Sequence, residues 1–278
     1  MDRDSYGFRR RELGGLLTRS AFLKLGGTGI AGAALLGSGA LAGCGGERGG
    51  SQQGGSQAQG AGGPAQEGGT LVLGVDAIQG NFDPGIFSTF GDWMALDCVA
   101  RGLTHIDYES TEPQPGLAES WEVSDDGTVY TFELRDGVKF HDGNPLTATD
   151  CERSFTRLMD PDDPSRPPGT YAIAELSGEN LREVRAVDER TFEITLGAPD
   201  VVFLSRLANP NGAILSAAAI DEYKDKIGTN LVGAGPFRFV DAQPGQKVTL
   251  EAFDDYYEGS PKLDRVVLQV LPDPSALT

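Results

Sequence analysis

Residues 117–150 read LAESWEVSDDGTVYTFELRDGVKFHDGNPLTATD and decide the fold of the chain. Apolar and polar residues alternate on both sides of a tight turn at 125–127, with Trp121 before the turn and Tyr130 after it. Alternation with a period of two around such a turn predicts a β-hairpin with one buried face and one wet face. The segment Thr147–Asp150 has the spacing of a capping box, which predicts that a helix begins there.

In the remainder of the region 70–278, apolar residues recur with the helical period in some segments and with the strand period of two in others. Expected helices cover 89–101, 201–207 and 216–226, and expected strands cover 70–75, 184–187, 191–196, 237–240, 247–253 and 265–271. This mixture, without an internal repeat, predicts an α/β fold. Asp273 and Pro274 are typical of a helix N-cap and first position, yet the sequence stops at Thr278, so we expect a partial chain.

The first 43 residues predict an export signal. All six basic residues of this segment lie within 1–24, residues 25–42 carry no charge, and small residues lead up to Cys44. The uncharged stretch is 18 residues long and contains six glycines, so it is too short and too poor in helix formers for a transmembrane span.

A linker is expected at 44–69. Eleven of the 25 positions from 45 to 69 are glycine and seven more are serine or glutamine. Such a segment cannot bury apolar surface, so it predicts a flexible coil that tethers a globular body.

The charge of the body excludes one class of partner. The chain has 23 basic and 41 acidic residues, a net charge of −18, and the residues after 43 carry 17 − 38 = −21. Such a body repels phosphates, so nucleic-acid binding through a broad basic surface is excluded. The chain also has only two histidines and three cysteines, which leaves little for a metal site with several soft ligands, and we expect neither a metal nor a cofactor.

Two short motifs at the N-terminus resemble known export signals. Leu41-Ala42-Gly43-Cys44 resembles the lipobox of bacterial lipoproteins, which implies that Cys44 is diacylated and becomes the mature N-terminus. A signal peptide that merely contains a cysteine is the alternative. The segment 18–24 resembles a twin-arginine motif in which Ser20 replaces the second arginine, so the export route stays open.

The stretch 117–150 also resembles the signature of the family 5 extracellular solute-binding proteins, the receptors of ABC importers for peptides, nickel and related solutes. Further segments match this family in the same order, at 154–161, 191–196, 233–239 and 261–265. The resemblance therefore covers nearly all of 70–278.

The resemblance implies a periplasmic-binding-protein-like fold of type II, in which two α/β lobes close on a ligand. On that pattern 70–98 and 197–278 form an incomplete first lobe, 99–196 form an inserted subdomain, and the second lobe is absent. The implied function is a receptor held by its lipid in the bilayer, on the outer face of the cytoplasmic membrane. It would bind oligopeptides and deliver them to an ABC permease. A truncated, non-functional remnant of such a receptor is the alternative.

Candidate ligand contacts lie in loops at the open edge of the sheet. The loop after the first strand contains Phe82, Phe87, Ser88 and Phe90, and the resemblance places Ser88 and Phe90 where peptide receptors touch their ligand. It places Tyr171 at another such contact. The nearly side-chain-free segment Gly233-Ala234-Gly235 can bring backbone groups close to an extended ligand. Ordinary loop packing is the alternative for each of these residues.

Cys98 and Cys151 would lie in an oxidising compartment, so they form either a disulfide or two buried free thiols.

The motifs and the few histidines favour a binding protein over an enzyme. An extracellular hydrolase is the competing class, but the chain has no Gly-x-Ser-x-Gly or His-Glu-x-x-His motif. His141, next to Asp142, is expected to be a turn residue. Only His105 and His141 could donate imidazole, so peptide is favoured over nickel.

Overall fold

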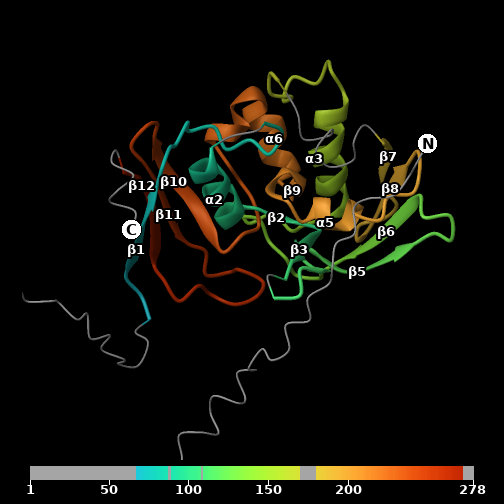
Figure 1. Cartoon of the computed structure of the whole chain (residues 1–278), viewed down its shortest axis with the longest axis horizontal. Helices are drawn as coiled ribbons and strands as arrows, with labels where there is room; N and C mark the ends of the chain where they lie inside the picture. Colours follow the sequence, from blue (N-terminus) through green and yellow to red (C-terminus); the bar gives the residue numbers. More distant parts are fainter. Residues whose placement is uncertain (1–66, 87–88, 108, 170–179, 272–278) are drawn as a thin grey trace, which may run out of the picture. The chain divides into compact units, whose positions relative to one another are not determined.

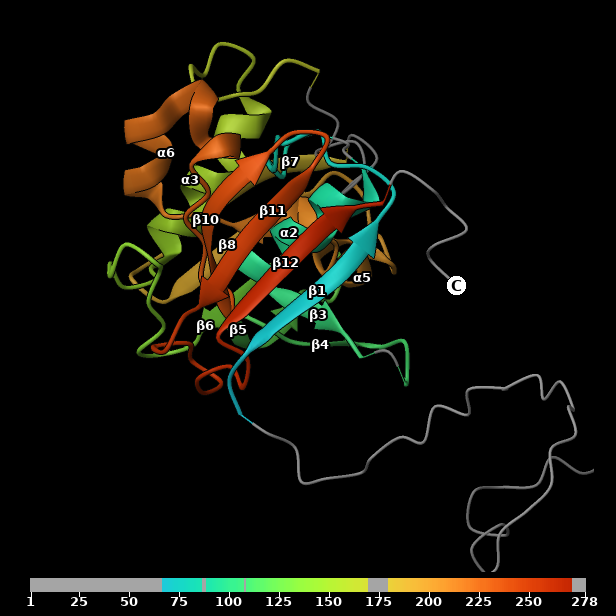
Figure 2. The same ribbon diagram turned by 90° about the vertical axis from the view of Figure 1, so that its left-hand side faces the viewer.

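A computed structural model of the chain describes residues 67–86, 89–107, 109–169 and 180–271. Its first sheet is mixed and has the order β1-β12-β11-β10, built from β1 (Thr70–Val75), β10 (Phe237–Gln243), β11 (Lys247–Ala252) and β12 (Arg265–Val270). β1 runs parallel to β12, and the other neighbours are antiparallel. Figure 2 shows these four strands side by side. The expected strands at 70–75, 237–240, 247–253 and 265–271 are therefore confirmed.

The second sheet is antiparallel and contains the predicted hairpin. Its order is β5-β6-β8-β7, formed by β5 (Ala118–Val123), β6 (Val129–Leu134), β7 (Leu181–Ala186) and β8 (Thr191–Leu196). Tyr130 and Phe132 are buried on one face of β6, as the alternation predicts. Trp121 is only half-buried, because β5 is the edge strand of the sheet and its side chain packs at the rim of the core.

Helix α3 (Ala148–Met159) begins at the predicted capping box. The backbone N–H and the hydroxyl of Thr147 both donate to Oδ2 of Asp150, at 2.9 Å and 2.7 Å. Oδ1 of Asp150 accepts from the N–H of Ala217 at 2.9 Å, so the same carboxylate ties α3 to α6 (Ala217–Tyr223). The rings of Phe155 and Phe192 stack at 5.8 Å, which packs α3 onto the second sheet.

The remaining elements connect the two sheets (Figure 1). They are α2 (Phe90–Val99), β2 (Arg101–Gly102), β3 (Thr104–Ile106), β4 (Pro113–Pro115), α5 (Phe203–Leu207), the 3₁₀ turn η1 (Pro210–Gly212), β9 (Ala213–Ile214) and the 3₁₀ turn η2 (Lys224–Thr229). The helix expected to reach residue 226 ends at Tyr223, because Lys224 has a left-handed φ of 51° and the chain continues as η2. The helix expected to reach 101 ends at Val99, and Arg101 instead lies in β2, where it pairs with Ile214 of β9.

The described residues form two hydrophobic cores. One lies between the second sheet, α3 and α5, and the other lies between the mixed sheet, α2 and α6. Phe203 and Leu207 of α5 pack into the core of the second sheet, so the segment 197–278 contributes to both cores. The division into a first lobe and an inserted subdomain stays a prediction. Within the described residues, no helix combines the length and the apolar character that a bilayer span requires.

Several expectations concern residues that the structure does not describe. These are the export signal at 1–43, most of the linker at 44–69 with Cys44, and the helix start at Asp273. They stay predictions from the sequence.

Candidate functional site

The candidate site begins with the loop that joins β1 to α2. This loop leaves β1 at its carboxyl end, and β12 runs parallel to β1, so both strands end at the same edge of the sheet. Ligands of open α/β sheets bind at the carboxyl ends of the strands. The position of the loop therefore agrees with the expected location of ligand contacts.

A single carboxylate, that of Asp92, closes both ends of this loop. Its Oδ1 accepts from the N–H of Gln79 at 3.1 Å and of Gly80 at 3.0 Å, and its Oδ2 accepts from the hydroxyl of Thr89 at 2.7 Å. Thr89 is the N-cap of α2 and forms a capping box with Asp92. The negative charge also lies in the first turn of the helix, where the helix dipole favours it. Sequence analysis missed this anchor, although Thr89 and Asp92 have the same spacing as Thr147 and Asp150.

The expected aromatic contacts in this loop differ in their exposure. Phe82 is 1% exposed, and its ring lies 5.5 Å from that of Phe239 in the core of the mixed sheet. This burial corrects the expectation for Phe82, whose side chain has no surface left for a ligand. Phe90, the first residue of α2, is 66% exposed and remains available. Phe87, Ser88 and Tyr171 lie outside the described residues.

The segment Gly233-Ala234-Gly235 packs against the end of α2. A Cβ atom at Gly233 would lie 2.3 Å from the carbonyl oxygen of Val99, and one at Gly235 would lie 2.5 Å from that of Cys98. The N–H of Gly235 donates to Val99 at 2.9 Å, and its carbonyl is 3.0 Å from Nε2 of His141. Ala234 is 1% exposed. Close approach within the fold therefore explains these glycines, which corrects the expectation that they meet a ligand.

His141 contributes to structure at this point. Its backbone N–H donates to the carbonyl of Gly233 at 3.0 Å, and its ring lies edge-on to Phe253 at 4.8 Å. Burial lowers the pKa of His141, although its hydrogen bond to Gly235 opposes that shift. Among the described residues, no group of three or more histidine, cysteine or acidic side chains could hold a metal ion.

One face of α2 carries a stripe of accessible side chains. Phe90, Trp93 and Asp97 are spaced at i, i+3 and i+7, so they lie on the same face of the helix. Trp93 is half-buried, and its spacing of three residues from Phe90 is the sequence signal that places both side chains on one face.

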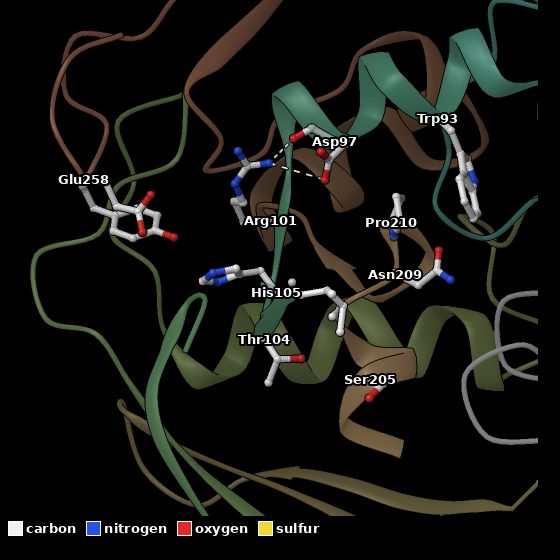
Figure 3. A pocket seen from close by; sticks show the side chains of 13 residues that line it. Trp93, Asp97, Arg101, Thr104, His105, Ser205, Asn209, Pro210 and Glu258 are labelled. Carbon is white, nitrogen blue, oxygen red and sulfur yellow. Dashed lines mark hydrogen bonds and ion pairs between the residues drawn. The ribbon is translucent and has the colours of Figure 1, made fainter. Parts of the chain in front are cut away.

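The stripe leads into a cavity of about 410 Å³ beside the C-terminal half of α2 (Figure 3). Its walls come from α2, β2, β3, α5, η1 and the chain after β11. The polar side chains that line it are Asp97, Arg101, Thr104, His105, Ser205, Asn209, Tyr257 and Glu258. Nη1 of Arg101 lies 3.5 Å from Oδ1 of Asp97. The cavity therefore offers both signs of charge, with the indole of Trp93 as an apolar wall.

Both cysteines of the body are free thiols. Cys98 packs against the core of the mixed sheet, whereas Cys151 is fully buried in the core of the second sheet. Of the two alternatives from the sequence, the structure contains the free thiols and not the disulfide.

We expect Cys98 to react slowly with alkylating agents in the native protein. Burial, reinforced by the charge of Asp97, raises its pKa to about 11. At pH 8.5 the thiolate fraction is then about 0.3%, against about half for an exposed cysteine, so alkylation slows by about 100-fold. Peptide-level mass spectrometry after timed iodoacetamide treatment measures this rate, with denatured protein as the control. Rapid native labelling of Cys98 would contradict the burial.

Comparison with known proteins assigns the family. Residues 112–278 match the family model described as bacterial extracellular solute-binding proteins, family 5 Middle. The dipeptide-binding protein of Escherichia coli is 34% identical over 222 residues, which is 74% of this chain and 42% of that protein. Heme-binding protein A of Haemophilus influenzae is 40% identical over 190 residues, which is 63% of this chain and 35% of that protein.

A solved structure agrees with these matches. The periplasmic binding protein DppA from Helicobacter pylori, in complex with the peptide STSA, superimposes with a TM-score of 0.70 at 33% identity, covering 76% of this chain and 44% of that chain. The expected α/β fold of the type II periplasmic-binding-protein class is thus confirmed. The chain spans about two fifths of the length of the curated relatives that it matches. Members of the family are solute-binding proteins of ABC importers and not enzymes. The chain therefore belongs to the family 5 bacterial extracellular solute-binding proteins.

Proposed function

We propose that this chain binds oligopeptides and presents them to the permease of an ABC importer. The observation that carries the proposal is the aromatic pair on one face of α2, the exposed Phe90 and the half-buried Trp93, which follows directly on the loop anchored by Asp92. The relatives support peptide as the solute class, since they include dipeptide-binding and di/tripeptide-binding proteins and a complex with a peptide. Phe87, Ser88 and Tyr171 remain proposed contacts on the family pattern.

The physical basis is an amphipathic wall. Aromatic side chains supply a large contact area at a low cost in side-chain entropy. Such a wall accepts peptides with different side chains, because it makes few demands on their identity. We assign 70–98 and 197–278 to a first ligand-binding lobe and 99–196 to an inserted subdomain. The separation of the mixed sheet from the antiparallel sheet supports this assignment.

Peptide binding is tested by saturation-transfer NMR with a pool of di- and tripeptides. We expect weak binding by residues 70–278, with a dissociation constant on the order of millimolar, because the match covers about two fifths of the length of the relatives. Trp93→Ala should remove most of the transfer. Val123→Ala, which truncates a 44% exposed residue on the antiparallel sheet, is the matched control and should leave it unchanged. Binding of haem but of no peptide would contradict the proposal.

We also propose that the protein is a lipoprotein at the outer face of the cytoplasmic membrane. The export signal at 1–43, the lipobox that ends at Cys44 and the glycine-rich linker at 44–69 support this proposal. The partners are then the bilayer, through the lipid, and the permease subunits.

Replacing Cys44 by alanine should release the protein from membranes. Without a thiol at that position no thioether-linked lipid can form, and one or two acyl chains supply most of the membrane affinity. Fractionation of cells expressing the variant should show loss of the membrane-bound form, while the unmodified chain yields a lipid-bearing Cys44 peptide by mass spectrometry. Membrane retention of Cys44→Ala equal to that of the original chain would rule out the anchor.

A further inference from the structure

Arg157 on α3 is a charged residue that the fold buries completely. Its side chain is 1% exposed and is among the largest fully buried side chains of the described residues. Burial of a charge is costly unless the charge is paired and hydrogen-bonded. The partners of Arg157 therefore identify what the molecule gains from this arrangement.

The guanidinium of Arg157 contacts two separate loops. Its Nη2 donates to Oδ1 of Asp83 at 2.6 Å, and its Nη1 donates to Oδ2 of Asp83 at 3.1 Å. Nη1 also donates to the carbonyl of Ser165 at 2.7 Å. Asp83 belongs to the loop between β1 and α2, and Ser165 belongs to the proline-rich loop that follows α3. One planar group thus joins both loops.

The turn that begins at Asp83 is held by further close contacts. Oδ1 of Asp83 also accepts from the N–H of Gly85 at 2.7 Å, and the carbonyl of Asp83 accepts from the N–H of Ile86 at 3.2 Å. A Cβ atom at Gly85 would lie 2.6 Å from Leu158 and 2.9 Å from Pro167. The turn that begins at Asp83 therefore rests on α3 and on the proline-rich loop at the same time.

Arg153, one helical turn earlier, provides a comparison. Its Nη1 donates to Asp163 at 2.8 Å and its Nε donates to Asp221 at 2.8 Å. Arg153 also holds the proline-rich loop, and its partners Asp163, Ser165 and Asp221 lie outside the loop between β1 and α2. The two arginines share a helix and a loop, but only Arg157 reaches the candidate site.

We infer that Arg157 is a positioning residue for solute binding, which fixes the loop between β1 and α2 against the proline-rich loop. The inference rests on the proposed function, because Arg157 would support the loop that ends at Thr89 and, through it, the aromatic wall of Phe90 and Trp93. Lysine keeps the charge at this position but is a point charge, and it cannot make the forked contact with a carboxylate while also reaching a carbonyl. Arg157→Lys should therefore loosen the loop while retaining the ion pair.

The test compares the original chain with Arg157→Lys and Arg153→Lys by hydrogen exchange and by titration with di- and tripeptides. In Arg157→Lys, we expect amide exchange at Gly85 and Ile86 to accelerate by about tenfold and peptide affinity to fall by about tenfold. Arg153→Lys should accelerate exchange only around Ser165 and leave the affinity unchanged. If both variants change exchange at Gly85 and Ile86 equally, or neither does, the inference is overturned.

A second variant covers the case in which Arg157→Lys does not fold. Asp83→Asn keeps one oxygen acceptor for the guanidinium and removes the charge, so it should reproduce the faster exchange at Gly85 and Ile86. Unchanged exchange in that variant would likewise overturn the inference. If the original chain binds no peptide at all, the proposed function fails, and the exchange data alone still decide whether Arg157 couples the two loops.

Discussion

Asp83→Ala should lower the free energy of unfolding by about 3–5 kcal/mol, because it leaves the guanidinium of Arg157 buried without a counter-charge. The side chains of this pair are 1% and 2% exposed, so water cannot replace the lost carboxylate. The variant also removes the acceptor for the N–H of Gly85. Urea unfolding, followed by circular dichroism, measures the change.

Two controls separate burial from charge in this experiment. Asp255→Ala breaks the ion pair between Lys139, which is 51% exposed, and Asp255, which is 60% exposed. This variant should lower the free energy of unfolding by less than about 1 kcal/mol. The double replacement Asp83→Leu with Arg157→Met should recover most of the lost stability, since an apolar pair of similar volume often substitutes for a buried ion pair. A cost for Asp83→Ala no larger than that for Asp255→Ala would contradict the burial of the pair.

Gly235→Ala should lower the free energy of unfolding by about 3 kcal/mol through overpacking. The new Cβ would lie 2.5 Å from the carbonyl oxygen of Cys98 and 2.6 Å from the carbonyl carbon of Val99. Both are backbone atoms, so the end of α2 must move away. That movement also weakens the hydrogen bond from Gly235 to Val99 and its contact with His141.

Gly137→Ala is the matched control for Gly235→Ala. Gly137 has a φ of 72° and nothing within 4 Å of its Cβ position. Alanine there should lower the free energy of unfolding only through the strain of the left-handed backbone, by about 1–2 kcal/mol. Thermal unfolding of both variants distinguishes the two causes. A larger loss of stability in Gly137→Ala than in Gly235→Ala would mean that the backbones do not approach as closely as described.

Local patterns predicted most elements of the fold. The hairpin of β5 and β6 and the start of α3 at Thr147 depend on neighbouring residues, so alternation and the capping-box spacing were sufficient. The end of α6 at Tyr223 was not visible, because nothing in the type of Lys224 indicates its left-handed backbone. The type II fold followed from the resemblance of a long segment to a known family, which no local pattern could supply.

The candidate site was predictable only in part. The sequence predicts a loop after the first strand, but it does not reveal which of the aromatic residues there face the core: Phe82 is buried, whereas Phe90 is exposed. The glycines at 233 and 235 fit a ligand-facing segment equally well until their contact with α2 is known. The pairing of Asp83 with Arg157 spans 74 positions, so no short motif could predict it.

Photo-crosslinking with a diazirine-bearing tripeptide tests most directly the claim that solute binds at the loop between β1 and α2. After irradiation, digestion and mass spectrometry, the label should concentrate in the fragments that contain Phe90 and Trp93. An excess of unlabelled tripeptide should compete it away. Competed labelling that falls instead on the strands of the antiparallel sheet, β5 to β8, would contradict the account.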